Sequence, residues 1–108
     1  MINRHYAKQT PATTGAISEL KVAVDLLSIG YHIFRAESPS CPCDLIALKN
    51  GKIFAVEVRT IARNRSGTIP KSAYTGKENG AVNCFAFVFK DDSEDIIYHT
   101  QYGKPMAM

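Results

Sequence analysis

The stretch CDLIALKNGKIFAVEVRT, residues 43–60, indicates two β-strands joined by a tight turn. The dipeptide Asn50-Gly51 lies between two apolar runs, and it is the strongest short-range signal for a hairpin with a two-residue turn. We therefore expect residues 44–48 and 52–60 to form an antiparallel hairpin.

Two acids and one base interrupt the apolar sequence of this hairpin. With a turn at 50–51, counting back along both strands places Asp44 directly opposite Glu57, with Cβ atoms about 4.5–5.5 Å apart. Like charges in such a pair destabilise a sheet, so a shared proton, a nearby cation or a bound metal ion must offset the repulsion. Because side chains alternate along a strand, Arg59 projects from the same face as Glu57. Two carboxylates and a cation are thus expected at one end of the hairpin.

A third acid comes from the segment before the hairpin. Residues 15–29 have the periodicity of an α-helix, with Thr13 or Thr14 as its N-terminal cap and Gly30 at its end. On a helical wheel the apolar arc holds Ile17, Leu20, Val22, Ala23, Val24, Leu26 and Leu27. Glu19 falls inside this arc, and a carboxylate directed toward a core is costly unless it is paired or bound to a cation. Glu19 is therefore a candidate site residue.

The remaining segments complete the predicted fold. Residues 31–36 are typical of a first strand, residues 84–89 (CFAFVF) of a strand buried on both faces, and residues 95–99 of a strand paired with it. Residues 63–83 are rich in Gly, Ser, Thr and Asn and are expected to be mostly loop, with a short helix within 72–78. This order predicts an α/β (α+β) fold, in which an N-terminal helix packs on a central mixed sheet of about five strands.

The length and composition favour one soluble domain. A chain of 108 residues is expected to form a single domain over residues 1–108. No apolar run approaches the ~18 residues that cross a membrane, and the N-terminus lacks the apolar core of a signal peptide. The three cysteines are an odd number, which favours a reduced, cytoplasmic setting.

Basic residues gather after the hairpin, although the net charge is only +3. No acid occurs between Val58 and Lys77, and a local basic stretch suits a polyanion such as DNA. A solvated loop explains the charge equally well. The candidate DNA-binding residues are Arg63, Arg65, Lys71 and Lys77.

Carboxylates in this number suit a hard cation, Mg²⁺ or Mn²⁺. A cation held by Glu19, Asp44 and Glu57 could polarise a phosphodiester and lower the pKa of an attacking water. The alternative is that Glu19 forms a salt bridge with Arg59, and that Asp44 and Glu57 are only polar residues at strand ends.

Three segments resemble the PD-(D/E)xK nuclease superfamily, in its small Holliday junction resolvase-like and homing-endonuclease-like branches. They are GAISELKVAVDLLSIGY, PCDLIA and FAVEVRT, and together they cover roughly the first 60 residues. The resemblance implies a restriction-endonuclease-like core, Mg²⁺-dependent hydrolysis of DNA phosphodiester bonds in branched or site-specific duplex DNA, and a homodimer or higher homo-oligomer. It assigns Asp44 and Glu57 as metal-binding acids and Glu19 as the helix acid that completes the site. Arg59 is then the fourth catalytic residue.

The sequence departs from the family pattern at two positions. Cys43 separates Pro42 from Asp44, so the Pro-Asp dipeptide is absent. Arg59 stands where the family usually has lysine; arginine stays charged and cannot act as a general base, although it can stabilise charge on a phosphate.

Three functions remain open at this stage. The first is a metal-dependent DNA endonuclease. The second is a nuclease-fold DNA-binding module that is catalytically weak or inactive because of Arg59. The third is an interaction subunit of a DNA-processing assembly, with exposed apolar positions among Phe85, Phe87 and Phe89 as the oligomer interface.

Overall fold

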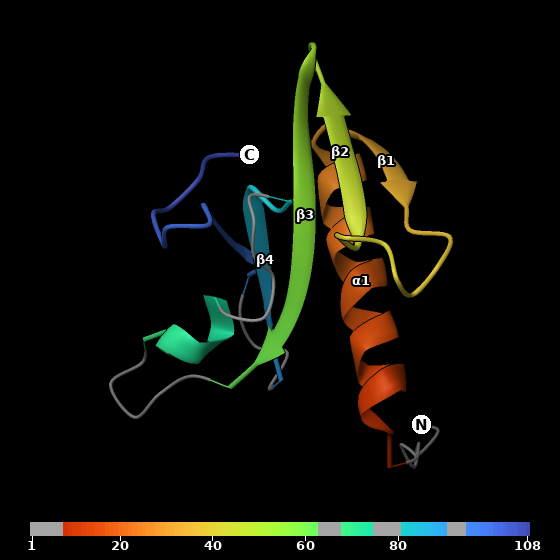
Figure 1. Ribbon diagram of the computed structural model, residues 1–108, viewed down its shortest axis with the longest axis vertical. Helices are drawn as coiled ribbons and strands as arrows, with labels where there is room; N and C mark the ends of the chain where they lie inside the picture. Colours follow the sequence, from red (N-terminus) through yellow and green to blue (C-terminus); the bar gives the residue numbers. More distant parts are fainter. Residues whose placement is uncertain (1–7, 63–67, 75–80, 91–94) are drawn as a thin grey trace, which may run out of the picture.

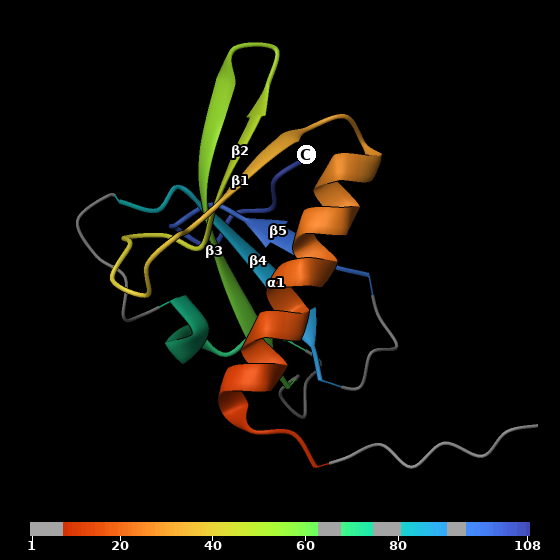
Figure 2. The same ribbon diagram turned by 90° about the vertical axis from the view of Figure 1, so that its right-hand side faces the viewer.

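A five-stranded mixed sheet carries one long helix on one face and a short 3-10 helix on the other (Figures 1 and 2). The computed structural model describes residues 8–62, 68–74, 81–90 and 95–108. The elements in chain order are α1 (Pro11–Ser28), β1 (His32–Arg35), β2 (Leu45–Lys49), β3 (Lys52–Ile61), η1 (Lys71–Tyr74), β4 (Cys84–Phe89) and β5 (Ile97–His99). The strands lie in the order β1-β2-β3-β4-β5, in which β3 and β4 are parallel and the other neighbours antiparallel. The predicted fold class is confirmed.

The turn between β2 and β3 has the predicted geometry. Asn50 and Gly51 have φ angles of 53° and 78°, and a two-residue type I′ hairpin turn requires positive φ at both positions. The register also agrees, because Lys49 pairs with Lys52. However, β2 begins at Leu45, one residue later than expected.

Helix α1 begins earlier than the periodicity predicts. Thr10 is its N-terminal cap, since its hydroxyl accepts a 3.2 Å hydrogen bond from the Thr13 N–H, and Pro11 occupies the first helical turn. The expected caps, Thr13 and Thr14, are therefore wrong. Gly30 follows the helix with a φ of 99°, as expected for a helix-terminating glycine.

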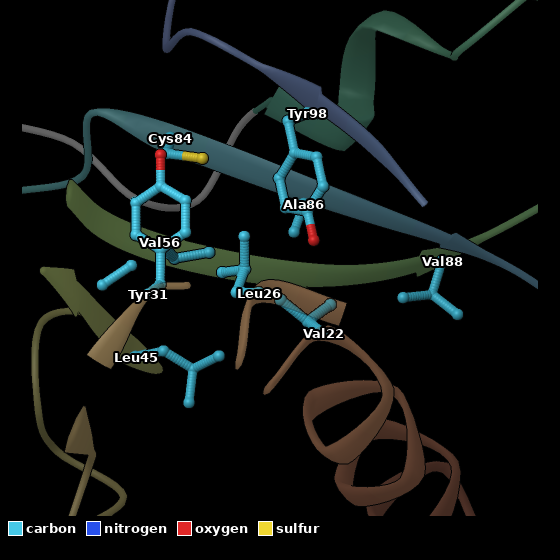
Figure 3. Close-up of a cluster of buried hydrophobic side chains, with 10 residues drawn as sticks. Val22, Leu26, Tyr31, Leu45, Val56, Cys84, Ala86, Val88 and Tyr98 are labelled. Atoms are coloured by element: carbon cyan, nitrogen blue, oxygen red, sulfur yellow. The ribbon is translucent and has the colours of Figure 1, made fainter. Parts of the chain in front are cut away.

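The helix packs on the sheet with only part of the face that was expected. Its buried residues are Ser18, Val22, Ala23 and Leu26. Val22 and Leu26 lie against Val56 of β3 and Ala86 of β4 (Figure 3). Polar Ser18 is tolerated in this core because its hydroxyl lies 2.5 Å from that of Thr60 and hydrogen-bonds with it.

Much of the apolar arc predicted to be core is exposed instead. Leu20, Val24 and Leu27 retain 49%, 65% and 55% of their accessible surface. The helix is apolar on both its inner and its outer side, so its periodicity alone places the buried face wrongly.

The second core lies on the other face of the sheet. Phe85 and Phe87 of β4 pack there with Ala73 and Tyr74 of η1 and with Val82. Every residue of β4 is buried, as the apolar run predicts. Phe85, Phe87 and Phe89 are therefore core residues, and the prediction that they form an exposed interface is wrong.

The connection between β3 and β4 is described only in part. The expected short helix at 72–78 is a 3-10 helix at Lys71–Tyr74, and the remainder of that range lies outside the described residues. Within the described ranges, no helix is long and apolar enough to cross a bilayer.

Candidate active site beside strand β3

The candidate site lies where β2 begins, at the point beyond which β3 has a strand partner on one edge only. Strand β2 pairs with β3 only as far as Leu45 and Val56, whereas β3 runs on to Ile61, paired with β4 on its other edge (Figure 1). We call the edge of β3 at residues 57–61 that faces away from β4, and that has no strand pairing with β2, the notch.

Asp44 occupies the mouth of the notch. Its Oδ2 atom accepts a 2.8 Å hydrogen bond from the N–H of Val58, and its own N–H donates to the carbonyl of Val56 at 3.0 Å. The carbonyl of Asp44 accepts from the N–H of Ala36 at 3.0 Å. Asp44 precedes β2, so it forms no regular strand pair with Glu57. Its carboxylate instead reaches the main chain of β3.

Glu57 and Arg59 lie on the sheet face opposite α1. Glu57 pairs with Phe85, and Arg59 with Phe87, in the parallel register of β3 and β4, and both phenylalanines belong to the core under η1. The guanidinium carbon of Arg59 lies 5.9 Å from the centroid of the Phe85 ring. The prediction that Glu57 and Arg59 share a face is therefore confirmed.

An ion pair compensates the burial of Glu57. Only 5% of its surface is exposed, and Nη2 of Arg59 lies 3.7 Å from its Oε2 atom. A buried carboxylate is costly without such a partner. Arg59 thus supplies the cation that the sequence requires next to Glu57.

Glu19 belongs to α1 and therefore lies on the helix side of the sheet. Its Oε1 atom lies 3.9 Å from Nη2 of Arg35, so its ion-pair partner is Arg35 and the alternative pairing with Arg59 is wrong. Burial raises the pKa of Glu19 above its ordinary value of 4.5, and the charge of Asp44 raises it further, while Arg35 acts in the opposite direction. Glu19 and Asp44 are therefore close enough for their charges to interact.

The three acids surround the start of the notch without forming one cluster. Asp44 lies at its mouth, Glu19 belongs to the helix side of the sheet, and Glu57 to the other face. Across the described ranges, no three His, Cys, Asp or Glu residues gather closely enough to hold a metal ion. The predicted three-acid arrangement is thus not assembled in this structure.

Asp44 and Glu19 nevertheless offer carboxylate oxygens, which are the ligands that a magnesium ion prefers. Mg²⁺ usually takes one or two carboxylates, with waters and substrate phosphates completing its octahedron. Burial is the main cause of the raised pKa of Glu19, and the charge of Asp44 adds to it; a cation between the two carboxylates would relieve this second contribution.

The predicted DNA-binding residues are described only in part. Lys71 is exposed at the start of η1, on the face of the sheet that carries Arg59. Arg63, Arg65 and Lys77 lie outside the described residues.

A groove beside the helix was missed by the sequence analysis. It has a volume of about 580 Å³, lies between α1 and the ends of β3 and β4, and is lined partly by Ser18, Lys21, Thr60 and Lys90. The two lysines suit a phosphate backbone, whereas the hydroxyls of Ser18 and Thr60 are bonded to each other. The sequence feature that could have indicated this groove is Lys90, a cation directly after the buried strand β4.

The raised pKa of Glu19 predicts a pH effect on stability. Since the folded protein holds this proton more tightly than the unfolded chain, the free energy of unfolding should fall as the pH rises from 4.5 through the raised pKa. Glu19→Gln should remove this part of the pH dependence. Urea denaturation between about pH 4 and 7 measures it, with exposed Glu37→Gln as the control. Equal slopes in Glu19→Gln and the wild type would contradict the interpretation.

Comparisons with known proteins give a match at the level of the fold. No protein-family model matches the chain, and no curated protein matches it in sequence. Among solved structures, the bacterial homing endonuclease I-Ssp6803I matches with a TM-score of 0.69 and 12% sequence identity. The match covers 86% of this chain and 70% of that protein. At this identity the two proteins share a fold.

Proposed function

We propose that this protein is a divalent-metal-dependent DNA endonuclease of the PD-(D/E)xK type, which hydrolyses phosphodiester bonds. The observation that carries the proposal is the carboxylate of Asp44, which is fixed on the N–H of Val58 at the mouth of the notch. Val58 lies between Glu57 and Arg59 in the chain, so the Asp44 carboxylate is held beside these two residues. Its charge also acts on Glu19. The fold shared with a bacterial homing endonuclease supports a nuclease by analogy.

In this proposal Asp44 and Glu19 hold Mg²⁺ or Mn²⁺, and Glu57 holds Arg59 in place. When bound, the cation polarises a phosphoryl oxygen and lowers the pKa of a water. The Arg59 guanidinium donates to a phosphate oxygen and stabilises its developing charge. Arginine remains protonated, so Arg59 binds and orients the phosphate and takes no proton.

Basic residues on both faces of the sheet would hold the DNA backbone. Lys71 lies on the Arg59 side, and Lys21 and Lys90 line the groove on the helix side. Contacts of this kind carry no sequence information, and they weaken as salt rises. The proposed substrates are branched DNA, such as a Holliday junction, and a specific duplex site.

A cleavage assay tests the proposed activity directly. The purified protein is incubated with end-labelled linear, single-stranded and four-way-junction DNA, in Mg²⁺, Mn²⁺ or EDTA. We expect cuts that require the metal, and the preferred substrate defines the class of nuclease. Binding of every substrate without cleavage in either metal would overturn the proposal.

The ion pair between Arg59 and Glu57 favours a second function, a DNA-binding module without catalysis. In that case Arg59 replaces the metal, and the thermal midpoint does not change with Mg²⁺. An endonuclease that binds Mg²⁺ in its folded state gains stability with metal concentration. A midpoint that rises with Mg²⁺ in the wild type, and less in Glu19→Gln, would argue against the binding module.

Arg59→Lys separates the two functions. Lysine keeps a positive charge next to Glu57, and its pKa can fall on burial, so it can take part in proton transfer. If the wild type is an endonuclease, we expect Arg59→Lys to cleave DNA at least as fast as the wild type in single-turnover assays. Cleavage that appears only in Arg59→Lys would identify the wild type as a binding module.

A further inference from the structure

Two cysteines lie in the connection between β1 and β2, close before Asp44. Cys41 and Cys43 are separated by a single residue, a proline. The connection is closed at its base, because the N–H of Ala36 donates to the carbonyl of Asp44 at 3.0 Å. We call residues 37–43, which this hydrogen bond encloses, the cysteine loop. A covalent change within the loop therefore occurs next to the candidate site.

The two cysteines of this loop open onto the same space. Both line a pocket of about 290 Å³, and both are partly exposed. The third cysteine, Cys84, has no exposed surface, and burial raises the pKa of its thiol to about 12. A reactive thiol must be accessible and able to ionise. The reactive cysteines of this chain are therefore Cys41 and Cys43.

The spacing of the two cysteines allows a disulfide bond between them. Two residues that are two positions apart have Cα atoms at most about 7 Å apart, and closer where the chain bends. A disulfide requires Cα atoms about 4.4–6.8 Å apart. The chain bends at each of residues 41–44, and the N–H of Cys41 donates to the carbonyl of Ser38 at 3.2 Å in the turn before them. The main chain thus already curves where the disulfide would close.

We propose that Cys41 and Cys43 are a redox modification site, which forms a reversible disulfide by exchange with a low-molecular-weight disulfide such as oxidised glutathione. Cys43 packs against the second core, so the first attack is assigned to Cys41. Its thiolate attacks the small disulfide, which gives a mixed disulfide and releases one small thiol. The Cys43 thiolate then attacks the Cys41 sulfur and releases the second small thiol. The two cysteines give up two electrons and two protons, which the released thiols take up.

This disulfide is expected to be easily reduced. It closes a ring that spans only the segment from Cys41 to Cys43, and strain makes a disulfide more reducible. Strained or exposed disulfides are the labile and regulatory ones. The site therefore responds to the ratio of small disulfide to small thiol, and it is not a permanent cross-link.

Formation of the disulfide displaces Asp44. Bringing the two sulfur atoms to bonding distance rotates the main chain between Cys41 and Cys43, and Asp44 follows directly in the chain. Two hydrogen bonds hold Asp44 on β3, one from its N–H to the carbonyl of Val56 and one from the N–H of Val58 to its carboxylate. Oxidation should weaken the second of these. The further consequence, slower metal-dependent cleavage in the oxidised form, rests on the proposed function.

Peptide mapping tests the disulfide without DNA. The full chain is equilibrated in glutathione buffers with an increasing oxidised fraction, alkylated in denaturant and digested with trypsin. Residues 36–49 form one tryptic peptide with both loop cysteines, and Cys84 lies in another peptide. We expect the first peptide to become lighter by two hydrogen atoms and to escape alkylation, whereas Cys84 is alkylated throughout. Dithiothreitol should reverse the change.

Two variants sharpen the mapping experiment. Cys84→Ala is the matched control, and it should form the same disulfide. Cys41→Ser should form no disulfide within the chain. Both variants should keep the wild-type circular dichroism spectrum. Loop cysteines that are alkylated in every buffer, or that oxidise only to mixed disulfides or to links between two chains, would overturn the proposal.

The amide resonance of Val58 reports the displacement of Asp44. Oxidation of the wild type should shift this resonance in NMR spectra, because the Val58 N–H donates to the Asp44 carboxylate, whereas the amide of Gly51 at the hairpin turn should not move. A complete disulfide that leaves the Val58 resonance unchanged would overturn the effect on Asp44. In the cleavage assay, oxidation should slow the wild type and leave Cys41→Ser unaffected. A chain that cleaves DNA in neither state contradicts the proposed function, and the mapped disulfide stands independently of it.

Discussion

Asp44→Asn is expected to reduce metal-dependent DNA cleavage by at least about 100-fold, because loss of even an outer-shell partner costs 10–100-fold in metal affinity or activity. Asparagine has nearly the same shape, and its amide oxygen can still accept the hydrogen bond that Val58 donates to Asp44. What it loses is the negative charge that attracts the cation and that interacts with Glu19. The substitution therefore separates the chemical role of Asp44 from its structural role.

Single-turnover cleavage and DNA binding in EDTA are measured side by side for this variant. Binding and the thermal midpoint without metal should stay close to those of the wild type. Glu37→Gln, which neutralises an exposed acid in the connection between β1 and β2, should cleave normally. Full cleavage by a clean Asp44→Asn preparation would remove Asp44 from the proposed site.

Phe87→Ala is expected to lower the free energy of unfolding by about 3–5 kcal/mol. Phe87 has no exposed surface. Its ring packs edge-to-face against Tyr74 (centroids 5.1 Å apart) and His99 (5.6 Å), and it stacks on Phe85 at 6.0 Å. Truncation leaves a cavity between β4 and η1 that the surrounding rings can fill only in part.

Urea denaturation monitored by circular dichroism measures this loss. Phe34→Ala is the control, because Phe34 of β1 is 56% exposed and should cost much less. Similar losses in the two variants would contradict the assignment of Phe87 to a tightly packed core.

The hairpin was predictable because its signal is local. Asn50 and Gly51 tolerate the positive φ angles that they adopt, and the turn fixes the register of both strands. The shared face of Glu57 and Arg59 follows from the same alternation. These predictions need only neighbouring residues, and the structure confirms them.

The orientation of α1 was not predictable in this way. Ser18 is not part of the apolar arc of the wheel, but it lies in the core, where Thr60, 42 residues later, supplies its hydrogen-bond partner. A partner so distant leaves no trace in the periodicity of the helix. Without it, the exposed residues Leu20, Val24 and Leu27 were included in the expected buried face.

The position of Asp44 was predicted in part. Its proximity to the second strand follows from the register, but the notch does not, because it depends on where β2 begins. The start of β2 is set by the irregular connection before it. At the end of this connection, the main chain of Asp44 hydrogen-bonds to Ala36 and Val56. The relation between Glu19 and Asp44 similarly depends on how the helix crosses the sheet.

The parallel pairing of β3 with β4 has a consequence for the order in which this protein acquires its structure during synthesis. Strands β1, β2 and β3 can pair as soon as they leave the ribosome, since each is joined to the next by a short connection. The outer half of β3 must wait for β4, because Glu57 pairs with Phe85, 28 residues later in the chain, and closing so long a loop is slow. The nascent chain therefore carries all four residues of the proposed site before the strand that buries Glu57 has been made.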